Sequence, residues 1–506
     1  MDDCSSVGPA AGCTADWQPV AERPRSHLGW LWLAVLVAFA LRMAALWWNP
    51  LEPNTMTTGY LEGVASLASG HGLLMPRLLD DEVRGPANAP AVIAALESRE
   101  AVGGRVDPEH PYPTSTAEWM GATFHPFGYT LLVYGLYCVG NYSGALFLTQ
   151  AFQVLLDSSA CLLIFVFARN VFGRRAALVA AWIYAVLPSA IIATMPLIPD
   201  ALAPFFTALV LALASSARAG RGWVLIPTGL AAGLAAQFRP EFMLLLVPIL
   251  VILLIWRPGV RSTLAWCVGM FAAYFLVMTP WIVWTYQQTG YVRLAAGSVG
   301  GAMYEGLGEL PDNPWGVTAN DEWLARDALA HGFTSALAPD GSEYYLKLWK
   351  QAVRERPADY ARLVLKTRLP QALVPAFAPQ VTAADMKLNL ASVMKAEGLS
   401  YSQVYKKYPF KVLRYKGPQL VTMAISPVLL LALLGVSLFR WRQWRALLWL
   451  FLPWAYTLST VVLFRAVLSR YLTPILVVET VALAVSIVTL TEWWCRWRGA
   501  AGAVPR

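Results

Sequence analysis

Asp200 is an isolated acid in an otherwise apolar stretch. The sequence "ATMPLIPDALAPF", residues 193 to 205, places it between two long apolar runs. It directly follows Pro199, so its side chain could cap the helix that the second run predicts. An ionisable residue between membrane-spanning segments is also a candidate for function. Both interpretations stay open on the sequence: a helix cap, or an acid that does chemistry at the membrane surface.

Further charged residues lie in two short turns between apolar runs. The stretch "AAQFRPEFMLL" holds Arg239 and Glu241, and "VVLFRAVLSRYLTPILVV" holds Arg465 and Arg470. A guanidinium group pairs with phosphate oxygens at two positions and stays charged, so these arginines suit an anionic ligand. The alternative is that they only reach towards lipid headgroups.

Two charges lie inside the apolar runs themselves. Arg42 is near the end of the first run, and Asp157 is near the middle of the second. Arg42 can reach the interface or bind an anionic substrate group, so we include it among the candidate donor-binding residues. We expect Asp157 to hydrogen-bond a neighbouring helix.

Acids and arginines at the ends of apolar runs suit one type of chemistry. Such a pocket could hold a phosphate group whose lipid tail stays in the bilayer. A carboxylate could then act as general base on an acceptor hydroxyl while the phosphate leaves a sugar anomeric carbon. The pattern predicts glycosyl transfer from a lipid phosphosugar.

The composition supports a membrane location. Of the 506 residues, 57% are apolar and only 14% are charged, which is far from a soluble globular composition. Many runs are long enough to cross a hydrocarbon core of about 30 Å. The sequence predicts an all-α polytopic membrane protein with these ten spans: 28–48, 144–168, 176–195, 201–217, 223–238, 242–256, 263–285, 418–439, 446–464 and 471–491. A shorter helix, 127–140, should lie partly embedded at the outer face.

Arginine placement predicts the orientation and the domains. Every second loop is basic, and short cytoplasmic loops collect Lys and Arg. The +8 net charge therefore reports topology and does not indicate nucleic-acid binding. The expected order is a cytoplasmic tail, a membrane module with an outer loop, a periplasmic soluble domain, the last membrane helices and a second cytoplasmic tail. Their ranges are 1–27, 28–285 with outer loop 49–143, 286–417, 418–491 and 492–506.

The two outer segments have their own predicted structure. Residues 57–69 have the spacing of an amphipathic helix on the membrane. The domain 286–417 should be mainly helical, with two helices broken at Pro357. The stretch "LPDNPWGVTANDEW" offers Asp312, Asp321 and Glu322 as oxygen ligands, so a divalent cation such as Mg²⁺ or Mn²⁺ is possible, although a solvated acidic loop explains them equally simply.

Several stretches resemble the membrane-embedded C-type glycosyltransferases. The sequence is similar to bacterial relatives of protein O-mannosyltransferases and of the lipid A aminoarabinose transferase, a family 39-like group. The resemblance rests on the order and spacing of "GYLEGVASLASGHGLL", "HPFGYTLLVYGLYCVGN", "FGRRAALVAAWIYAVLPSAIIATMPLIPDALAPFFTALVLAL", "GLAAGLAAQFRPEFMLLLVP", "GGAMYEGLGELPDNPWGV" and "SRYLTPILVV". It implies a polyprenyl-phosphate sugar donor, inversion at the anomeric centre, and an active site that faces the periplasm.

The resemblance also assigns individual residues. Asp200 matches an active-site acid, and Arg470 with Tyr471 matches an "RY" pair before the last span. Tyr60 and His125 stand in two of the quoted stretches and are expected to contact the donor or its substrate. The family usually has an acid four residues before the position of Tyr60, where this sequence has Met56.

The missing acid leaves the general base open. Glu52 or Asp200 is the first candidate, and Glu62 is the third. The expected enzyme is an inverting glycosyltransferase in the bacterial inner membrane, which transfers a hexose or pentose to a lipid, glycan or protein. The alternatives are a lipid-linked sugar flippase or other transporter, and an inactive relative that only binds the donor. The lack of internal repeats argues against a transporter.

Overall fold

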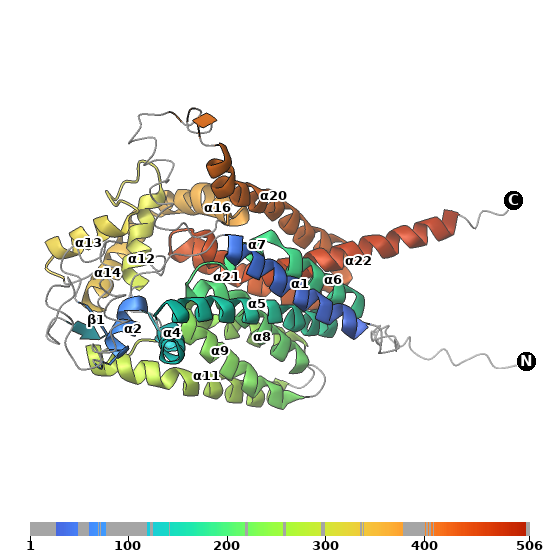
Figure 1. Ribbon diagram of the computed structural model, residues 1–506, viewed down its shortest axis with the longest axis horizontal. Coiled ribbons are helices and arrows are strands. Elements are labelled where there is room, and N and C mark those ends of the chain that lie inside the picture. The colour runs from blue at the N-terminus through green and yellow to red at the C-terminus, as the bar shows by residue number, and fades with distance from the viewer. Residues whose placement is uncertain are drawn as a thin grey trace, which may run out of the picture.

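The computed structural model is almost entirely helical in the part of the chain that it describes (Figure 1). That part comprises residues 27–48, 60–68, 72–76, 119–121, 125–140, 142–217, 221–256, 260–294, 299–333, 339–377 and 409–501, with a few isolated positions between them. Seven of its helices are long and apolar enough to cross a membrane: Leu28–Trp47, Gly144–Phe172, Pro199–Ser216, Arg261–Thr289, Lys416–Phe439, Trp441–Phe464 and Ile475–Trp497. The chain is therefore a multi-pass membrane protein.

Three of the ten predicted spans are not among these seven long helices, so the predicted number of spans was higher than the number of long apolar helices. Residues 176–195 form two helices, α6 (Arg174–Val186) and α7 (Pro188–Ala193). The other two are the apolar helices Gly222–Phe238 and Pro240–Ile255, which contain α9 (Leu225–Phe238) and α10 (Leu246–Trp256). Pro188 and Pro240 explain the breaks, because a proline ring removes a backbone donor and clashes with the preceding turn. The short helix expected at 127–140 is present as α4 (Gly128–Val139).

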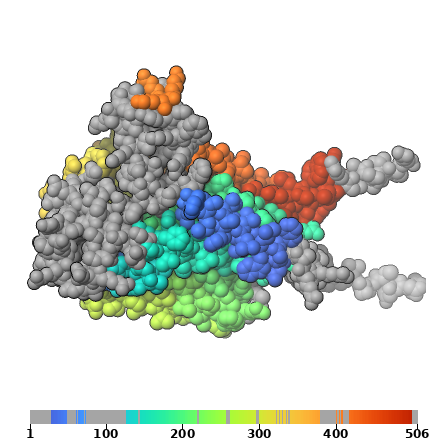
Figure 2. Space-filling view, viewed as in Figure 1, coloured from blue at the N-terminus to red at the C-terminus, as the bar shows by residue number. Residues whose placement is uncertain are grey.

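The membrane bundle is held together by close helix contacts. On its surface α1 (His27–Trp48) packs against α5 (Tyr142–Phe172) and α6, and Figure 2 shows α1 lying across this face. Elsewhere in the bundle, α9 packs along α11 (Val260–Thr289). A Cβ atom at Gly229 would collide with the carbonyl of Met270, and one at Gly233 would lie 2.9 Å from the carbonyl oxygen of Tyr274. These glycines let the two backbones approach closely.

A helical unit covers one end of the bundle (Figure 1). This end unit, residues 299–373, contains α12 (Val299–Glu305), α13 (Asp321–Ala330), α14 (Pro339–Glu355), α15 (Pro357–Arg362), a π-helical turn (Leu363–Arg368) and α16 (Leu369–Leu373). The break expected at Pro357 is confirmed. The described residues between 299 and 373 are thus mainly helical, whereas the two ends of the predicted domain 286–417 continue the long helices α11 (Val260–Thr289) and α20 (Pro409–Phe439).

The first loop contributes two small elements at the same end. The predicted amphipathic helix is present as α2 (Tyr60–Ala68). A two-stranded antiparallel sheet, β1 (Leu74–Pro76) with β2 (Trp119–Gly121), was not predicted; it pairs Met75 with Met120. The remaining long helices are α8 (Ala203–Ser216), α20 (Pro409–Phe439), α21 (Trp444–Phe464) and α22 (Ile475–Ala501), which extends beyond the bundle at the opposite end (Figure 1).

Candidate active site

A cavity of about 420 Å³ lies where the end unit meets the ends of the membrane helices. Residues Val299, Ala302 and Met303 of α12 form one wall. The other walls come mainly from three short turns and from α2. Eight of the eleven residues proposed from the sequence line this cavity: Tyr60, His125, Asp200, Arg239, Glu241, Arg465, Arg470 and Tyr471.

The three turns share one local shape. Each consists of an extended residue followed by a short 3-10 helix: Pro199–Leu202, Pro240–Leu244 and Ser469–Leu472. In the first two turns a proline occupies the first helical position, where its missing N–H costs nothing. Proline also pushes the preceding residue into the extended region, which is the conformation of Ile198 and Arg239. The turns therefore interrupt the apolar helices at the positions of the polar residues.

Asp200 does not act as a helix cap. Its side chain caps neither the 3-10 turn nor α8, and its Oδ1 atom lies 3.0 Å from Nη1 of Arg239. The side chain is only 11% exposed, and Asp200 lines the cavity. The structure thus favours a carboxylate of the cavity wall, paired with an arginine, over the capping alternative.

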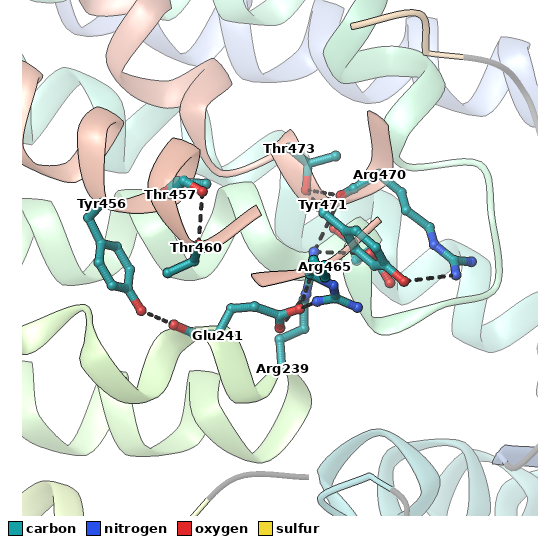
Figure 3. A network of polar contacts seen from close by, with 10 residues as sticks. Arg239, Glu241, Tyr456, Thr457, Thr460, Arg465, Arg470, Tyr471 and Thr473 are labelled. Carbon is teal, nitrogen blue, oxygen red and sulfur yellow. Dashed lines mark hydrogen bonds and ion pairs between the residues drawn. The ribbon is translucent and has the colours of Figure 1, made fainter. Parts of the chain in front are cut away.

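Glu241 connects two of the arginines (Figure 3). Its carboxylate accepts hydrogen bonds from Nη2 of Arg239 at 3.1 Å and from Nε at 3.3 Å, and it also pairs with Arg465. The hydroxyl of Tyr456 donates to its backbone carbonyl. Arg239 reaches the third turn as well, where its Nη1 atom donates to the carbonyl of Arg470 at 3.3 Å. One guanidinium group therefore links all three turns.

Three guanidinium groups surround the ring of Tyr471. The distances from their central carbon atoms to the ring centroid are 5.5 Å for Arg239, 3.4 Å for Arg465 and 5.1 Å for Arg470. Such cation–π contacts are favourable when water is excluded. Burial alone would raise the pKa of the Tyr471 hydroxyl, but Arg465 and Arg470 outweigh it and lower this pKa. The ring of Tyr471 thus lies at the centre of the arginine cluster.

Arg470 is the guanidinium group most open to a ligand. Its Nη2 atom donates to the Tyr471 hydroxyl at 3.2 Å, while its buried Nε atom has no hydrogen-bond partner within the described chain. No described carboxylate forms an ion pair with it, unlike Arg239 and Arg465, which share Glu241. A buried donor without a partner is costly. A phosphate oxygen would satisfy it.

His125 and Tyr60 form an aromatic wall of the cavity. Their rings stack with centroids 5.2 Å apart and an interplanar angle of 10°, and Tyr60 meets Tyr129 edge-on at 5.1 Å. Burial, together with the smaller effect of the nearby arginines, lowers the pKa of His125 to about 3. His125 is therefore neutral at physiological pH, where it can donate one hydrogen bond and accept another.

We expect His125 not to titrate above pH 5. Because its pKa is about 3 in the folded protein and 6.5 in a model peptide, the unfolded chain binds a proton over that interval and the folded chain does not. Stability should therefore fall as the pH falls from 6.5 towards 3. Thermal unfolding of wild type and His125→Gln across this range should show a larger acid loss for wild type. A histidine NMR signal that is assigned to His125 and titrates near 6.5 would contradict this.

Arg42 lies away from the cavity, so its predicted role in donor binding has no support in its position. Its Nε atom pairs with Oδ2 of Asp157 at 2.5 Å, and both side chains are fully buried between α1 and α5. Nη1 donates to the carbonyls of Ala38 and Ala185, and the hydroxyl of Tyr184 donates to Asp157 at 2.6 Å. The charge inside the first span is neutralised by one inside the second, so neither reaches the interface.

The other candidate bases are not placed by the structure. Glu52 and Met56 lie outside the described residues, and only the backbone of Glu62, within α2, is described. Within the described part of the chain, no three His, Cys, Asp or Glu residues gather where they could hold a metal ion. Both described carboxylates of the cavity face guanidinium groups, an arrangement that suits an anionic ligand.

The sequence interpretation missed several residues that shape the site. Thr473 donates from Oγ1 to the carbonyl oxygens of Asp200, at 3.2 Å, and Arg470, at 3.1 Å, so it ties the first turn to the third. Thr473 stands in the stretch "SRYLTPILVV", close enough to Arg470 to have been considered. Glu309, described below, likewise stands in a quoted stretch, "GGAMYEGLGELPDNPWGV", whereas its partner Arg368 stands in none.

The sequence comparisons place part of this site in a known family. Residues 125–284 match the family described as dolichyl-phosphate-mannose-protein mannosyltransferase. For this similarity we call residues 125–284 the mannosyltransferase segment. It contains Asp200, Arg239 and Glu241, whereas Arg465 and Arg470 lie beyond it. No curated protein matches the sequence of the whole chain.

Solved structures show a similar fold. The apo oligosaccharyltransferase of Archaeoglobus fulgidus matches with a TM-score of 0.50 and 12% identity, over 95% of this chain and 52% of that chain. The same archaeal enzyme, AglB, in complex with an inhibitory peptide and a dolichol-phosphate matches with a TM-score of 0.48 and 14% identity, over the same shares. Its complex with Zn and sulfate gives 0.47 and 13%, over 92% and 49%. The chain spans about half the length of the solved structures it matches.

Proposed function

We propose that this protein is an inverting glycosyltransferase that moves a sugar from a polyprenyl-phosphate donor to a lipid, glycan or protein acceptor. The observation that carries the proposal is that one cavity is lined by Asp200 and by three arginines: Arg239 of the second turn, Arg470 of the third, and Arg465 at the end of α21. A carboxylate and a cluster of guanidinium groups are the two components that this reaction requires. The family of the mannosyltransferase segment supports a lipid-phosphate donor.

The chemistry follows from the positions of these groups. The arginines hold the phosphate group of the donor, and Asp200 accepts a hydrogen bond from the acceptor hydroxyl. As the hydroxyl oxygen bonds to the anomeric carbon, the bond from that carbon to the phosphate oxygen breaks. The hydroxyl proton passes to Asp200, and the polyprenyl phosphate leaves with the bonding electron pair. Arg239 holds the Asp200 carboxylate in place at 3.0 Å.

The charge of the cavity favours a phosphodiester donor. Among the described residues that line it, Arg239, Arg465 and Arg470 exceed Asp200 and Glu241 by one charge, and His125 is neutral. A phosphodiester carries one negative charge, which balances this excess. A diphosphate carries more negative charge than this excess can balance. At least one negative charge would then stay unpaired in a partly buried site, which is unfavourable.

We place the reaction at the outer face of a bacterial inner membrane. The alternation of basic loops puts residues 49–143 and 286–417 on that side. The end unit and the three turns would then face the periplasm. A glycan or protein acceptor would reach the cavity from the aqueous side, beside α12.

Transfer of labelled sugar from a panel of polyprenyl-phosphate hexoses and pentoses tests the proposal. Wild type should transfer at least one sugar, and Arg470→Gln should raise the KM for that donor about tenfold to a hundredfold, as expected for a lost charge-assisted hydrogen bond. Arg440→Gln is the matched control, because Arg440 bonds Thr489 and Gln443 away from the cavity.

The other outcomes identify the competing functions. Donor binding without transfer would indicate a relative that only binds the lipid. Movement of the intact donor across vesicles without transfer would indicate a flippase. An Arg470→Gln enzyme with an unchanged donor KM would remove Arg470 from the proposed phosphate site.

A further inference from the structure

Arg368 is a fully buried arginine in the end unit. Its Nε atom pairs with Oε2 of Glu309 at 2.7 Å, and its Nη2 atom donates to the carbonyl of Gly306 at 2.6 Å. Its Nη1 atom donates to the carbonyl of Val462, at the end of α21, at 3.3 Å. A buried charge persists only where it is paired and hydrogen-bonded, and here every nitrogen of the guanidinium group has a partner.

Glu309 completes a bridge to the site. While Oε2 pairs with Arg368, its Oε1 atom accepts a hydrogen bond from the backbone N–H of Val467 at 2.9 Å. The two side chains therefore hold both sides of Arg465, one through Val462 and the other through Val467. The segment 462–467 leads directly into the turn that carries Arg470 and Tyr471.

The surrounding packing is built for this bridge. A Cβ atom at Gly306 would collide with the Arg368 guanidinium group and would lie 3.1 Å from the backbone nitrogen of Ala466. Only glycine allows so close an approach. The hydroxyl of Tyr360 also donates to the carbonyl of Leu463, and Trp349 packs on Phe464 with ring centroids 6.2 Å apart. The end unit thus contacts the segment 462–467 at several residues.

We infer that Arg368 and Glu309 are positioning residues, which hold the segment 462–471 so that the guanidinium groups of Arg465 and Arg470 face the donor phosphate. The role of the phosphate in this inference rests on the proposed function. The claim that Arg368 and Glu309 keep the segment rigid does not depend on that function. If so, the end unit contributes to the donor site through these two residues, although α12 is its only described element that lines the cavity. A single hydrogen bond to the backbone would hold the segment on one side of Arg465 only, whereas the pair of side chains bonds both Val462 and Val467.

Two measurements on Arg368→Lys test it. A lysine keeps the charge but cannot donate to three partners in the planar geometry of arginine. With the donor that wild type uses, the variant should show a KM raised about threefold to thirtyfold and a smaller change in kcat. A spin label at Leu468→Cys, with the native cysteines replaced by serine, should become more mobile in the variant. Leu468 is exposed and can carry the label.

The control is Tyr345→Phe, which removes the hydrogen bond from the fully buried Tyr345 to Asp327 within the same end unit. It should leave both the label and the donor KM unchanged, even where it lowers the Tm as much as Arg368→Lys does. A label that stays immobile in Arg368→Lys overturns the inference. A mobile label in a protein that neither binds nor transfers a donor sugar confirms the positioning and overturns only the proposed function.

Discussion

Asp200→Asn is expected to abolish sugar transfer while leaving the protein folded and able to bind the donor. Asparagine has nearly the same shape and can still accept a hydrogen bond, but it cannot take a proton from the acceptor hydroxyl. Loss of a general base costs about 10²-fold to 10⁴-fold in rate. The arginines that bind the phosphate remain, so donor affinity should stay within a few-fold or increase. Single-turnover transfer and donor binding, measured on the same preparation, separate these effects.

Glu479→Gln is the matched control for this variant. Glu479 is 7% exposed, as Asp200 is 8% exposed, but it lies in α22, accepts a hydrogen bond from Trp454 at 3.0 Å and does not line the cavity. A glutamine can keep that bond, so transfer should continue at the wild-type rate. Full activity in Asp200→Asn would exclude Asp200 as the base. Glu52 and Glu62, the other candidate bases proposed from the sequence, would then be tested by Glu→Gln substitution.

Arg42→Met is expected to cause the largest loss of stability of any change considered. It removes the partner of Asp157 and leaves a buried carboxylate between α1 and α5, where both members of the pair are fully buried. Breaking a buried ion pair on one side costs about 3–5 kcal/mol, because the remaining charge has no compensation. The protein should unfold at a lower temperature in detergent, and its expression in membranes should fall.

The double variant Arg42→Met with Asp157→Leu distinguishes a structural pair from a binding site. Replacing both charges with apolar groups removes the unpaired carboxylate, so most of the lost stability should return. Activity for each folded molecule should then match that of wild type, since neither residue lines the cavity. A stable double variant with a raised donor KM would instead restore the role in donor binding that the sequence suggested for Arg42.

The polar turns could be predicted from the sequence because charged residues are rare beside apolar membrane spans. Acids and arginines are costly near apolar spans, so Asp200, Glu241 and Arg465 stand out from their neighbours. The alternation of basic loops places the turns that carry these residues on the same side of the membrane. The sequence therefore predicted that their side chains would lie in one pocket. The aromatic wall of Tyr60 and His125 depended on the resemblance, since a tyrosine or a histidine near a membrane has many roles.

Other features required the structure. The pairing of Arg42 with Asp157 joins residues 115 positions apart, and nothing in either apolar run indicates its partner. The bridge of Glu309 and Arg368 joins residues in a region of mixed polar sequence, where charged side chains are usually solvated. The predicted span 176–195 is divided at Pro188, because hydropathy alone does not show that this proline begins a new helix.

The two short apolar helices beside the cavity change the membrane around it. Gly222–Phe238 and Pro240–Ile255 meet at the turn that carries Arg239, and each is only about 25 Å long at 1.5 Å per residue. A typical hydrocarbon core is about 30 Å thick, so we expect lipids next to these helices to compress and the bilayer to thin locally. Water and headgroups then reach deeper on this side of the protein than elsewhere. A lipid-bound sugar could meet a water-borne hydroxyl at the depth of the arginines while its hydrocarbon tail stays fully within the membrane.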